Sequence, residues 1–146
     1  MTRNTAALAF LSIDKTEGAK THLSSDKVHL LLQKIHTLMA GQRPFLRERY
    51  TLEDFARDVD LQPYQLSAFL NTVMAQNFHT LINGYRIRHC VELLQAGGNR
   101  RIRVKQMAQL CGFRNRNSFI TAFKRHTNRN YANFFSAFLL IVCQHL

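Results

Sequence analysis

The chain has 146 residues, enough for one domain or two small ones, and its 46% apolar content is sufficient for a buried core. It carries 20 Lys and Arg against 9 Asp and Glu, a formal net charge of +11. The apolar runs at 6–13 and 134–143 are far shorter than the ~20 residues that a membrane-spanning helix needs, so the sequence predicts no such helix.

The charge is unevenly distributed along the chain. Residues 1–92 hold all nine acidic residues together with eleven basic ones, whereas residues 93–146 hold nine basic residues and no acid. A basic half beside a nearly balanced half favours a polyanionic partner that is contacted mainly from one end. The alternative, that the positive charge only serves solubility, stays open from composition alone.

The cysteines favour a reduced, cytoplasmic protein. Cys90, Cys111 and Cys143 are odd in number and lack a CxxC spacing, which argues against a disulfide framework. A zinc site formed by His89, Cys90 and a distant partner matches no usual ligand spacing. We therefore expect no metal site and no cofactor.

Helical periodicity and capping signals organise the first half of the chain after an N-terminal arm. Ser24, Ser25 and Asp26 predict the start of a helix that ends at Gly41. Thr51 and Asp54 resemble the capping box of a second helix, and Pro63 suits the first turn of a third. The predicted buried faces comprise Val28, Leu31, Leu32, Ile35, Leu38, Met39, then Leu52, Phe55, Ala56, Val59, then Leu66, Phe69 and Leu70.

The second half continues the helical pattern. A long helix is predicted over 78–95, stopped by Gly97-Gly98. The apolar spacing resumes over 104–111, breaks at Gly112 and returns on a helix that carries Phe119, Ala122 and Phe123. No stretch alternates with period 2 for long enough to argue for a sheet, so the fold class is predicted to be all-α.

The two halves repeat each other. A shift of 52 residues places Ala108 on Ala56 and Phe113 on Leu61, and a one-residue insertion in the second turn then changes the shift to 53, placing Phe123 on Leu70. Each repeat is therefore a short helix, a tight turn with an apolar plug, and a second short helix. This is the pattern of a helix-turn-helix, present twice.

The second repeat, VKQMAQLCGFRNRNSFITAFKRHT at 104–127, closely resembles the second helix-turn-helix of AraC/XylS-type transcription regulators. The family pattern of apolar-Ala, Gly-Phe and Phe-x-x-x-Phe-Lys is met by Met107-Ala108, Gly112-Phe113, Phe119 and Phe123-Lys124. The first repeat and the connecting stretch NGYRIRHCVELL at 83–94 match as well. Where the family usually has Gly-x-x-Pro after the second repeat, this chain has Asn128 and Tyr131.

The resemblance implies two helix-turn-helix subdomains, at 25–76 and 97–146, joined by a linker helix at 77–96, with the arm at 1–24 ahead of them. It implies sequence-specific binding to double-stranded DNA, with the two recognition helices in successive major-groove segments, and contact with RNA polymerase. The apolar tail is interpreted as core, with a protein contact as the alternative.

The candidate DNA-binding residues lie on the second helix of each repeat or, for the second repeat, also in the turn before it; the N-terminal residues of that helix contact base edges in this motif. Arg pairs bidentately with guanine and Asn with adenine, whereas Lys124 and Arg125 suit phosphates. The acids at 53, 54, 58 and 60 predict that the first repeat contributes less affinity than the second. The candidates are Tyr64, Gln65, Ser67, Ala68 and Asn71 in the first repeat, and Arg114, Asn115, Arg116, Asn117, Ile120, Thr121, Lys124 and Arg125 in the second.

Two other functions are alternatives to DNA binding. One is a protein-interaction module that keeps the helix-turn-helix fold and acts on another regulator or on polymerase, which the acids of the first repeat and the altered segment at 128–135 favour. The other is an enzyme, for which the sequence offers no Gly-rich phosphate loop, no paired carboxylates and no nucleophile beside a base. We expect the protein not to be an enzyme.

Overall fold

The computed structural model describes residues 25–97 and 102–134. The expectations for the N-terminal arm, for Ser24 and Gly98, and for the apolar tail from residue 135 onward lie outside the described part of the chain.

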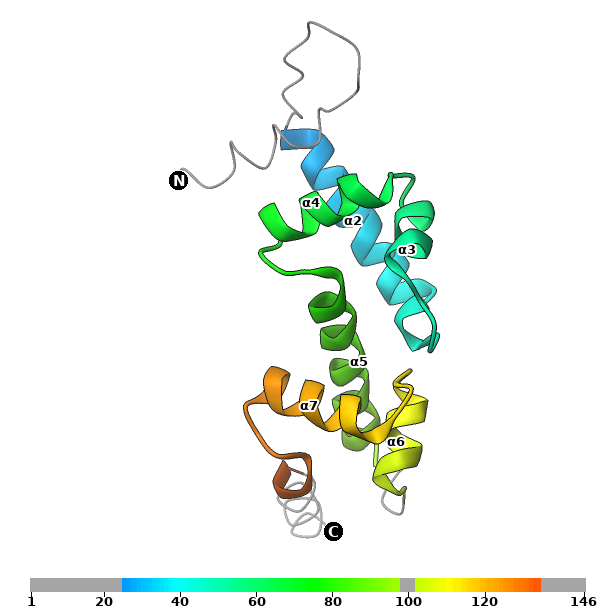
Figure 1. The fold of residues 1–146 in the computed structure, drawn as a ribbon, viewed down its shortest axis with the longest axis vertical. Coiled ribbons are helices and arrows are strands. Elements are labelled where there is room, and N and C mark those ends of the chain that lie inside the picture. Colours follow the sequence, from blue (N-terminus) through cyan, green and yellow to red (C-terminus); the bar gives the residue numbers. More distant parts are fainter. Residues whose placement is uncertain (1–24, 98–101, 135–146) are drawn as a thin grey trace, which may run out of the picture. The chain divides into compact units, whose positions relative to one another are not determined.

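Every regular element of the described chain is a helix or a helical turn, which confirms the all-α prediction (Figure 1). None of the helices in these ranges is long and apolar enough to cross a membrane. The elements in chain order are α2 (Ser25–Gly41), the 3-10 helix η1 (Pro44–Leu46), α3 (Leu52–Asp58), α4 (Pro63–Thr72), α5 (Phe78–Gln95), α6 (Val104–Leu110) and α7 (Arg116–Thr127).

The described residues form two compact units that interleave in sequence. Unit 1 contains residues 25–44 and 49–81, and unit 2 contains residues 45–48, 82–97 and 102–134. Helix α5 begins in unit 1 and continues in unit 2. The short 45–48 segment belongs to unit 2 although the residues on both sides of it belong to unit 1.

Local capping signals set where the helices of unit 1 begin. The hydroxyl of Thr51 accepts a 3.1 Å hydrogen bond from the backbone N–H of Asp54, and the Asp54 carboxylate accepts one from the N–H of Thr51. The predicted capping box is therefore confirmed. Pro63 occupies the first turn of α4, where its missing N–H leaves no helical hydrogen bond unmade.

The core of unit 1 is formed by the apolar faces of α2, α3 and α4 and the start of α5. The rings of Tyr50, Phe55 and Phe78 pack with centroid separations of 6.0–6.2 Å. Burying each large apolar side chain contributes about 1.5–3 kcal/mol. The buried residues of this core are Ile35, Leu38, Met39, Tyr50, Phe55, Ala56, Val59, Leu66, Phe69, Leu70 and Leu81.

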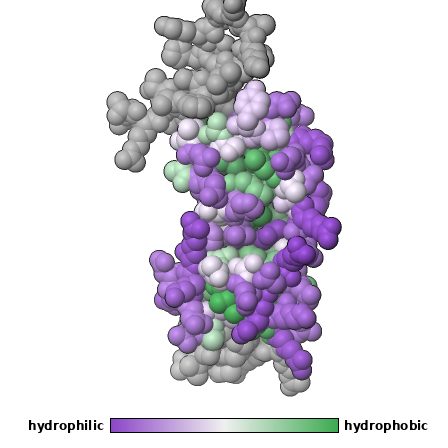
Figure 2. All heavy atoms as spheres, viewed as in Figure 1, coloured by the Kyte–Doolittle hydropathy of each residue, from purple (hydrophilic) through white to green (hydrophobic). Residues whose placement is uncertain are grey.

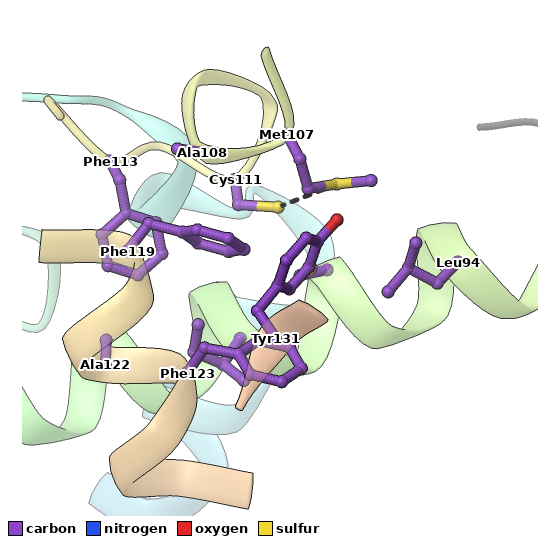
Figure 3. Close-up of a cluster of buried hydrophobic side chains, with 11 residues drawn as sticks. Leu94, Met107, Ala108, Cys111, Phe113, Phe119, Ala122, Phe123 and Tyr131 are labelled. Atoms are coloured by element: carbon purple, nitrogen blue, oxygen red, sulfur yellow. Dashed lines mark hydrogen bonds between the residues drawn. The ribbon is translucent and has the colours of Figure 1, made fainter. Parts of the chain in front are cut away.

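The core of unit 2 is an aromatic and sulfur-containing cluster between α5, α6 and α7 (Figure 3). The ring of Phe119 meets those of Phe113 and Tyr131 edge-to-face at centroid distances of 5.4 and 5.0 Å. Phe123 meets Tyr131 in the same way at 5.1 Å. Such pairs add about 0.5–1.5 kcal/mol beyond the burial of their area, so α7 is firmly attached to unit 2 through its apolar face.

The surface that Figure 2 shows is mostly hydrophilic over the described residues, with apolar residues visible in smaller areas. Few large apolar side chains are strongly exposed: Leu30, Tyr64 and Leu110. Because the apolar side chains are mostly buried, the polar faces of the short helices lie in solvent, where a partner can reach them.

Candidate nucleic-acid interface

The two helix-turn-helix motifs have the same turn geometry. In unit 1 the N–H of Leu61 donates a 2.9 Å hydrogen bond to the carbonyl oxygen of Ala56, and in unit 2 the N–H of Phe113 donates one of 2.9 Å to that of Ala108. These partners are related by the shift of 52 residues predicted from the sequence. Both alanines are buried, with 1% of their surface exposed. The predicted repeat is therefore present in the backbone as well as in the residue pattern.

Each turn contains one residue in the left-handed backbone region. This residue is Asp60 in unit 1, with φ of 59°, and Gly112 in unit 2, with φ of 82°. Position 112 also has no room for a side chain, because a Cβ atom there would lie 2.7 Å from the carbonyl oxygen of Phe45. The turn before α7 therefore lies directly against the 45–48 segment.

The second helix of each motif starts one residue later in unit 2 than the shift of 52 would give. The N-cap residues are Gln62 for α4 and Asn115 for α7, which are 53 positions apart, as the sequence predicted. The side-chain oxygen of Asn115 accepts a 2.8 Å hydrogen bond from the N–H of Ser118. Asn115, predicted as a base reader, thus has a structural role as the cap of α7. Its preference for N-cap positions was a signal that the sequence already contained.

Helix α7 separates a buried face from an exposed one. Phe119, Ala122 and Phe123 are buried in the core of unit 2. At about 100° per residue, Asn117 and Lys124 lie on the opposite side of the helix. Among the candidate readers of this unit, the exposed ones are Arg114, Asn115, Arg116, Asn117, Thr121, Lys124 and Arg125, and Ile120 is half-buried.

The candidates of unit 1 lie on α4 and are less exposed and partly engaged within the helix. Gln65 accepts a 3.0 Å hydrogen bond from the N–H of Gln62, and Asn71 donates one of 2.9 Å to the carbonyl of Ser67. Tyr64 is exposed over 58% of its surface. Of the remaining candidates, Asn71 is exposed, whereas Gln65, Ser67 and Ala68 are half-buried.

Three of the acids of unit 1 have partners inside that unit. Asp54 pairs with Arg57 at 3.2 Å, and Asp58 accepts a 2.9 Å hydrogen bond from the hydroxyl of Tyr50. Asp60 forms an ion pair with Lys34. These three carboxylates therefore have a structural explanation that does not require a protein partner.

Arg86 on α5 holds the 45–48 segment in unit 2. Its Nε atom donates a 2.7 Å hydrogen bond to the carbonyl of Phe45, and its Nη2 atom donates one of 2.9 Å to that of Arg47. The guanidinium also lies over the ring of Phe113, 5.3 Å from its centroid. Burial lowers the pKa of Arg86 below its ordinary value, and the nearby charge of Glu48 opposes this effect.

The structure places an acid beside Arg114, the candidate reader in the turn before α7, which sequence reasoning missed. The Oε1 atom of Glu48 lies 3.9 Å from the Nε atom of Arg114, and both side chains are exposed. No local sequence signal predicts this pair, since the two residues are distant along the chain. It depends on the 45–48 segment joining unit 2.

The end of α7 keeps its geometry despite the departure from the family pattern. Asn128 adopts the left-handed conformation with φ of 55° at the C-cap, as expected for the residue that replaces glycine. The hydroxyl of Thr127 donates a 2.7 Å hydrogen bond to the carbonyl of Phe123. Tyr131, which stands at the position of the usual proline, is buried against Phe119 and Phe123.

The cysteines that the structure describes are core residues. Cys90 and Cys111 are free thiols, both fully buried. The neighbouring Cys111 and burial together raise the pKa of Cys90, which disfavours a reactive thiolate. Across residues 25–97 and 102–134, no group of His, Cys, Asp and Glu side chains is arranged to hold a metal ion.

The chain is similar to known helix-turn-helix proteins in sequence. Residues 55–136 match the family described as "Helix-turn-helix domain". The chain is 30% identical over 97 residues to an uncharacterised HTH-type transcriptional regulator, YijO, of Escherichia coli K12. That match covers 64% of this chain but only 33% of the relative, so the chain spans about a third of its length.

The fold is similar to a solved structure, that of the C-terminal domain of AraT, a response regulator from Geobacillus stearothermophilus. The TM-score is 0.59 with 23% sequence identity, and the likeness covers 80% of this chain and 88% of the other. At this identity the comparison shows a shared fold.

Proposed function

This chain belongs to the AraC-type helix-turn-helix family, and from that premise we propose that it is a transcription regulator that binds double-stranded DNA in a sequence-specific manner. In this proposal, α4 and α7 enter two adjacent major-groove segments about one helical turn, roughly 34 Å, apart. The similarity to an HTH-type transcriptional regulator supports the regulatory role.

One observation carries the proposal, namely the polar face of α7. Its buried face is fixed in the core by Phe119 and Phe123, so the opposite face is presented to solvent on a rigid element. That face lies in the half of the chain with nine basic residues and no acid. Rigid presentation of Arg and Asn side chains is what direct readout of base edges requires.

The residues divide into base readers and phosphate contacts. Arg114, in the turn before α7, and Arg116, its first residue, suit bidentate bonds to guanine, and Asn117 suits adenine. Lys124 and Arg125, nearer the C-terminal end, suit phosphates, which position the protein without reading sequence. On α4, the neutral side chains of Tyr64 and Ser67 supply weaker contacts. We expect unit 2 to provide most of the affinity.

A contact with RNA polymerase belongs to the same proposal and rests on the family alone. The rival function, a protein-interaction module without DNA binding, is less well supported in the described residues. The acids at 54, 58 and 60 are paired within unit 1, and the C-cap of α7 is intact.

The test is selection of bound duplexes from random DNA, followed by gel shifts on a selected site over a series of salt concentrations. Specific binding should exceed binding to a scrambled duplex by 10³-fold or more at physiological salt, and the affinity should fall steeply with salt. The Asn117→Ala Lys124→Ala double variant should bind the selected site more weakly, relax the preference at one base pair and reduce the salt slope by about one. If the parent chain binds no duplex at low salt, the interaction-module function is favoured instead.

A further inference from the structure

The 45–48 segment is fixed in unit 2 by three kinds of contact. Arg86 donates to the carbonyls of Phe45 and Arg47, at 2.7 and 2.9 Å. The ring of Phe45 stacks on that of Tyr85, with the centroids 5.5 Å apart, and is 5% exposed. On its other side the segment lies against Gly112, where no Cβ atom fits. The backbone of Glu48, which follows Arg47, is therefore held beside the turn that leads into α7.

The next residue is Glu48, and its carboxylate meets the side chain of Arg114. The Oε1 atom lies 3.9 Å from Nε of Arg114, with the two side chains 54% and 78% exposed. The chain has nine acidic residues. Within the described residues, Glu48 is the only one of them that forms an ion pair with a candidate base reader.

The atom through which Arg114 makes this contact matters chemically. A guanidinium binds guanine through two N–H groups directed at O6 and N7. At 3.9 Å the carboxylate is too far from Nε for a hydrogen bond, so it acts as a nearby charge that favours conformations in which Nε faces Glu48. The edge formed by the two terminal nitrogens is then directed away from the carboxylate. A phosphate can be bound through the same two nitrogens, but it brings a second negative charge toward Glu48.

We propose that Glu48 is a positioning residue that orients Arg114 for bidentate recognition of guanine and, by repelling phosphate, opposes the use of Arg114 in non-specific binding. The inference rests on the proposed DNA-binding function of α7. It assigns to an acid outside the helix-turn-helix motif a role in specificity, because a repulsive element against wrong partners raises discrimination as effectively as an attractive one.

The experiment uses the full chain and a duplex selected from random DNA. The Arg114→Ala variant first identifies the base pair at which preference relaxes. Four duplexes that differ only at this base pair are then titrated by fluorescence anisotropy. Glu48→Gln should reduce the preference for guanine about two- to fivefold, the range expected of an exposed ion pair, and should raise affinity for a scrambled duplex. Glu48→Asp should retain part of the preference.

Two controls separate positioning from net charge and from folding. Glu92→Gln, in the same unit, makes the same change in charge and should affect all four duplexes equally. In the Arg114→Ala background, Glu48→Gln should leave the relative affinities of the four duplexes unchanged. Thermal melting checks that Glu48→Gln keeps the parental midpoint.

Parental preference in Glu48→Gln, or an equal loss in the Arg114→Ala background, overturns the inference while leaving DNA binding intact. The inference is also overturned if the parent prefers particular base pairs and Arg114→Ala leaves all of these preferences unchanged. A parent that binds no duplex overturns the proposed function and this inference together.

Discussion

The Nε atom of Arg86 donates a 2.7 Å hydrogen bond to the carbonyl oxygen of Phe45, 41 residues earlier in the chain. Because the same guanidinium also donates to the carbonyl of Arg47, a single side chain binds two carbonyls of the 45–48 segment. Lysine cannot reproduce this fork. We expect Arg86→Lys to lower the free energy of unfolding by about 1.5–3 kcal/mol, measured by urea denaturation.

The matched control is Arg88→Lys on the same helix, where the side chain is exposed and its contact is with the Tyr85 ring. A cation remains over that ring in the variant, so the change in stability should stay within about 0.5 kcal/mol. Equal effects of the two substitutions would contradict the role assigned to Arg86.

Gly112 is required for both its backbone conformation and its lack of a side chain. We expect Gly112→Ala to be strongly destabilising, because φ is 82° and a Cβ atom would lie 2.7 and 2.9 Å from backbone atoms of Phe45 and Leu46. Gly97→Ala is the control, since φ is 73° there but nothing lies within 4 Å of the added carbon. It should cost only the left-handed conformation, about 1–2 kcal/mol. Thermal melting that finds Gly112→Ala no worse than Gly97→Ala would refute the close approach.

Phe113 is the apolar plug of the second turn and is 3% exposed. Its truncation to Ala should cost about 3–5 kcal/mol in the free energy of unfolding, because a buried ring leaves a cavity that its neighbours fill only partly. Leu61, the equivalent residue of unit 1, is only half-buried, so Leu61→Ala should cost less. An unchanged melting midpoint for Phe113→Ala would be incompatible with its place in the core.

The capping box of α3 predicts the sign of one pH effect. The N–H and hydroxyl of Thr51 lower the pKa of Asp54 below its ordinary value of 3.8. The carboxylate therefore adds stability above pH 3.8, and this contribution is lost as the pH falls through the lower pKa of the folded state. In Asp54→Asn, urea midpoints should fall less steeply between about pH 5 and pH 2 than in the parent. A parental slope would argue against the contribution of the box.

The sequence predicted those features of the fold that local signals determine. The bounds of α5 and the shared turn of the two motifs followed from glycines, caps and apolar spacing, which act within a few residues. The one-residue insertion in the second turn was also predicted from apolar spacing, and it separates the N-caps Gln62 and Asn115 by 53 positions. The left-handed conformation of Asn128 was likewise expected from its residue type.

The features that the sequence did not predict depend on contacts between distant residues. The 45–48 segment belongs to unit 2, where Arg86 donates hydrogen bonds to it, and Glu48 at its end lies near Arg114. For the interface, residue type and helical position suggested Asn117 and Lys124 as candidates, and their exposure is now known. Their roles toward DNA remain predictions.

Within the proposed DNA interface, Arg116 and Lys124 are expected to make different kinds of contact. Arg116 is the first residue of α7 and is exposed, so it suits a base edge. Arg116→Ala should cost about 1–3 kcal/mol of binding free energy and relax preference at one base pair. Lys124→Ala should weaken binding to all sequences alike and reduce the salt slope by about one, as the loss of one phosphate contact requires. Fluorescence anisotropy on a selected site at several salt concentrations measures both quantities.

Ser67→Ala on α4 completes this comparison between the two units. Its hydroxyl is neutral and its side chain half-buried, so its loss should cost less than either change in α7, because hydrogen bonds of charged groups are about twice as strong as neutral ones. The three variants therefore rank the two helices by their contribution to binding. If Arg116→Ala binds like the parent while Ser67→Ala does not, α4 rather than α7 is the dominant reader, and the acid-free half of the chain serves mainly to attract the phosphate backbone.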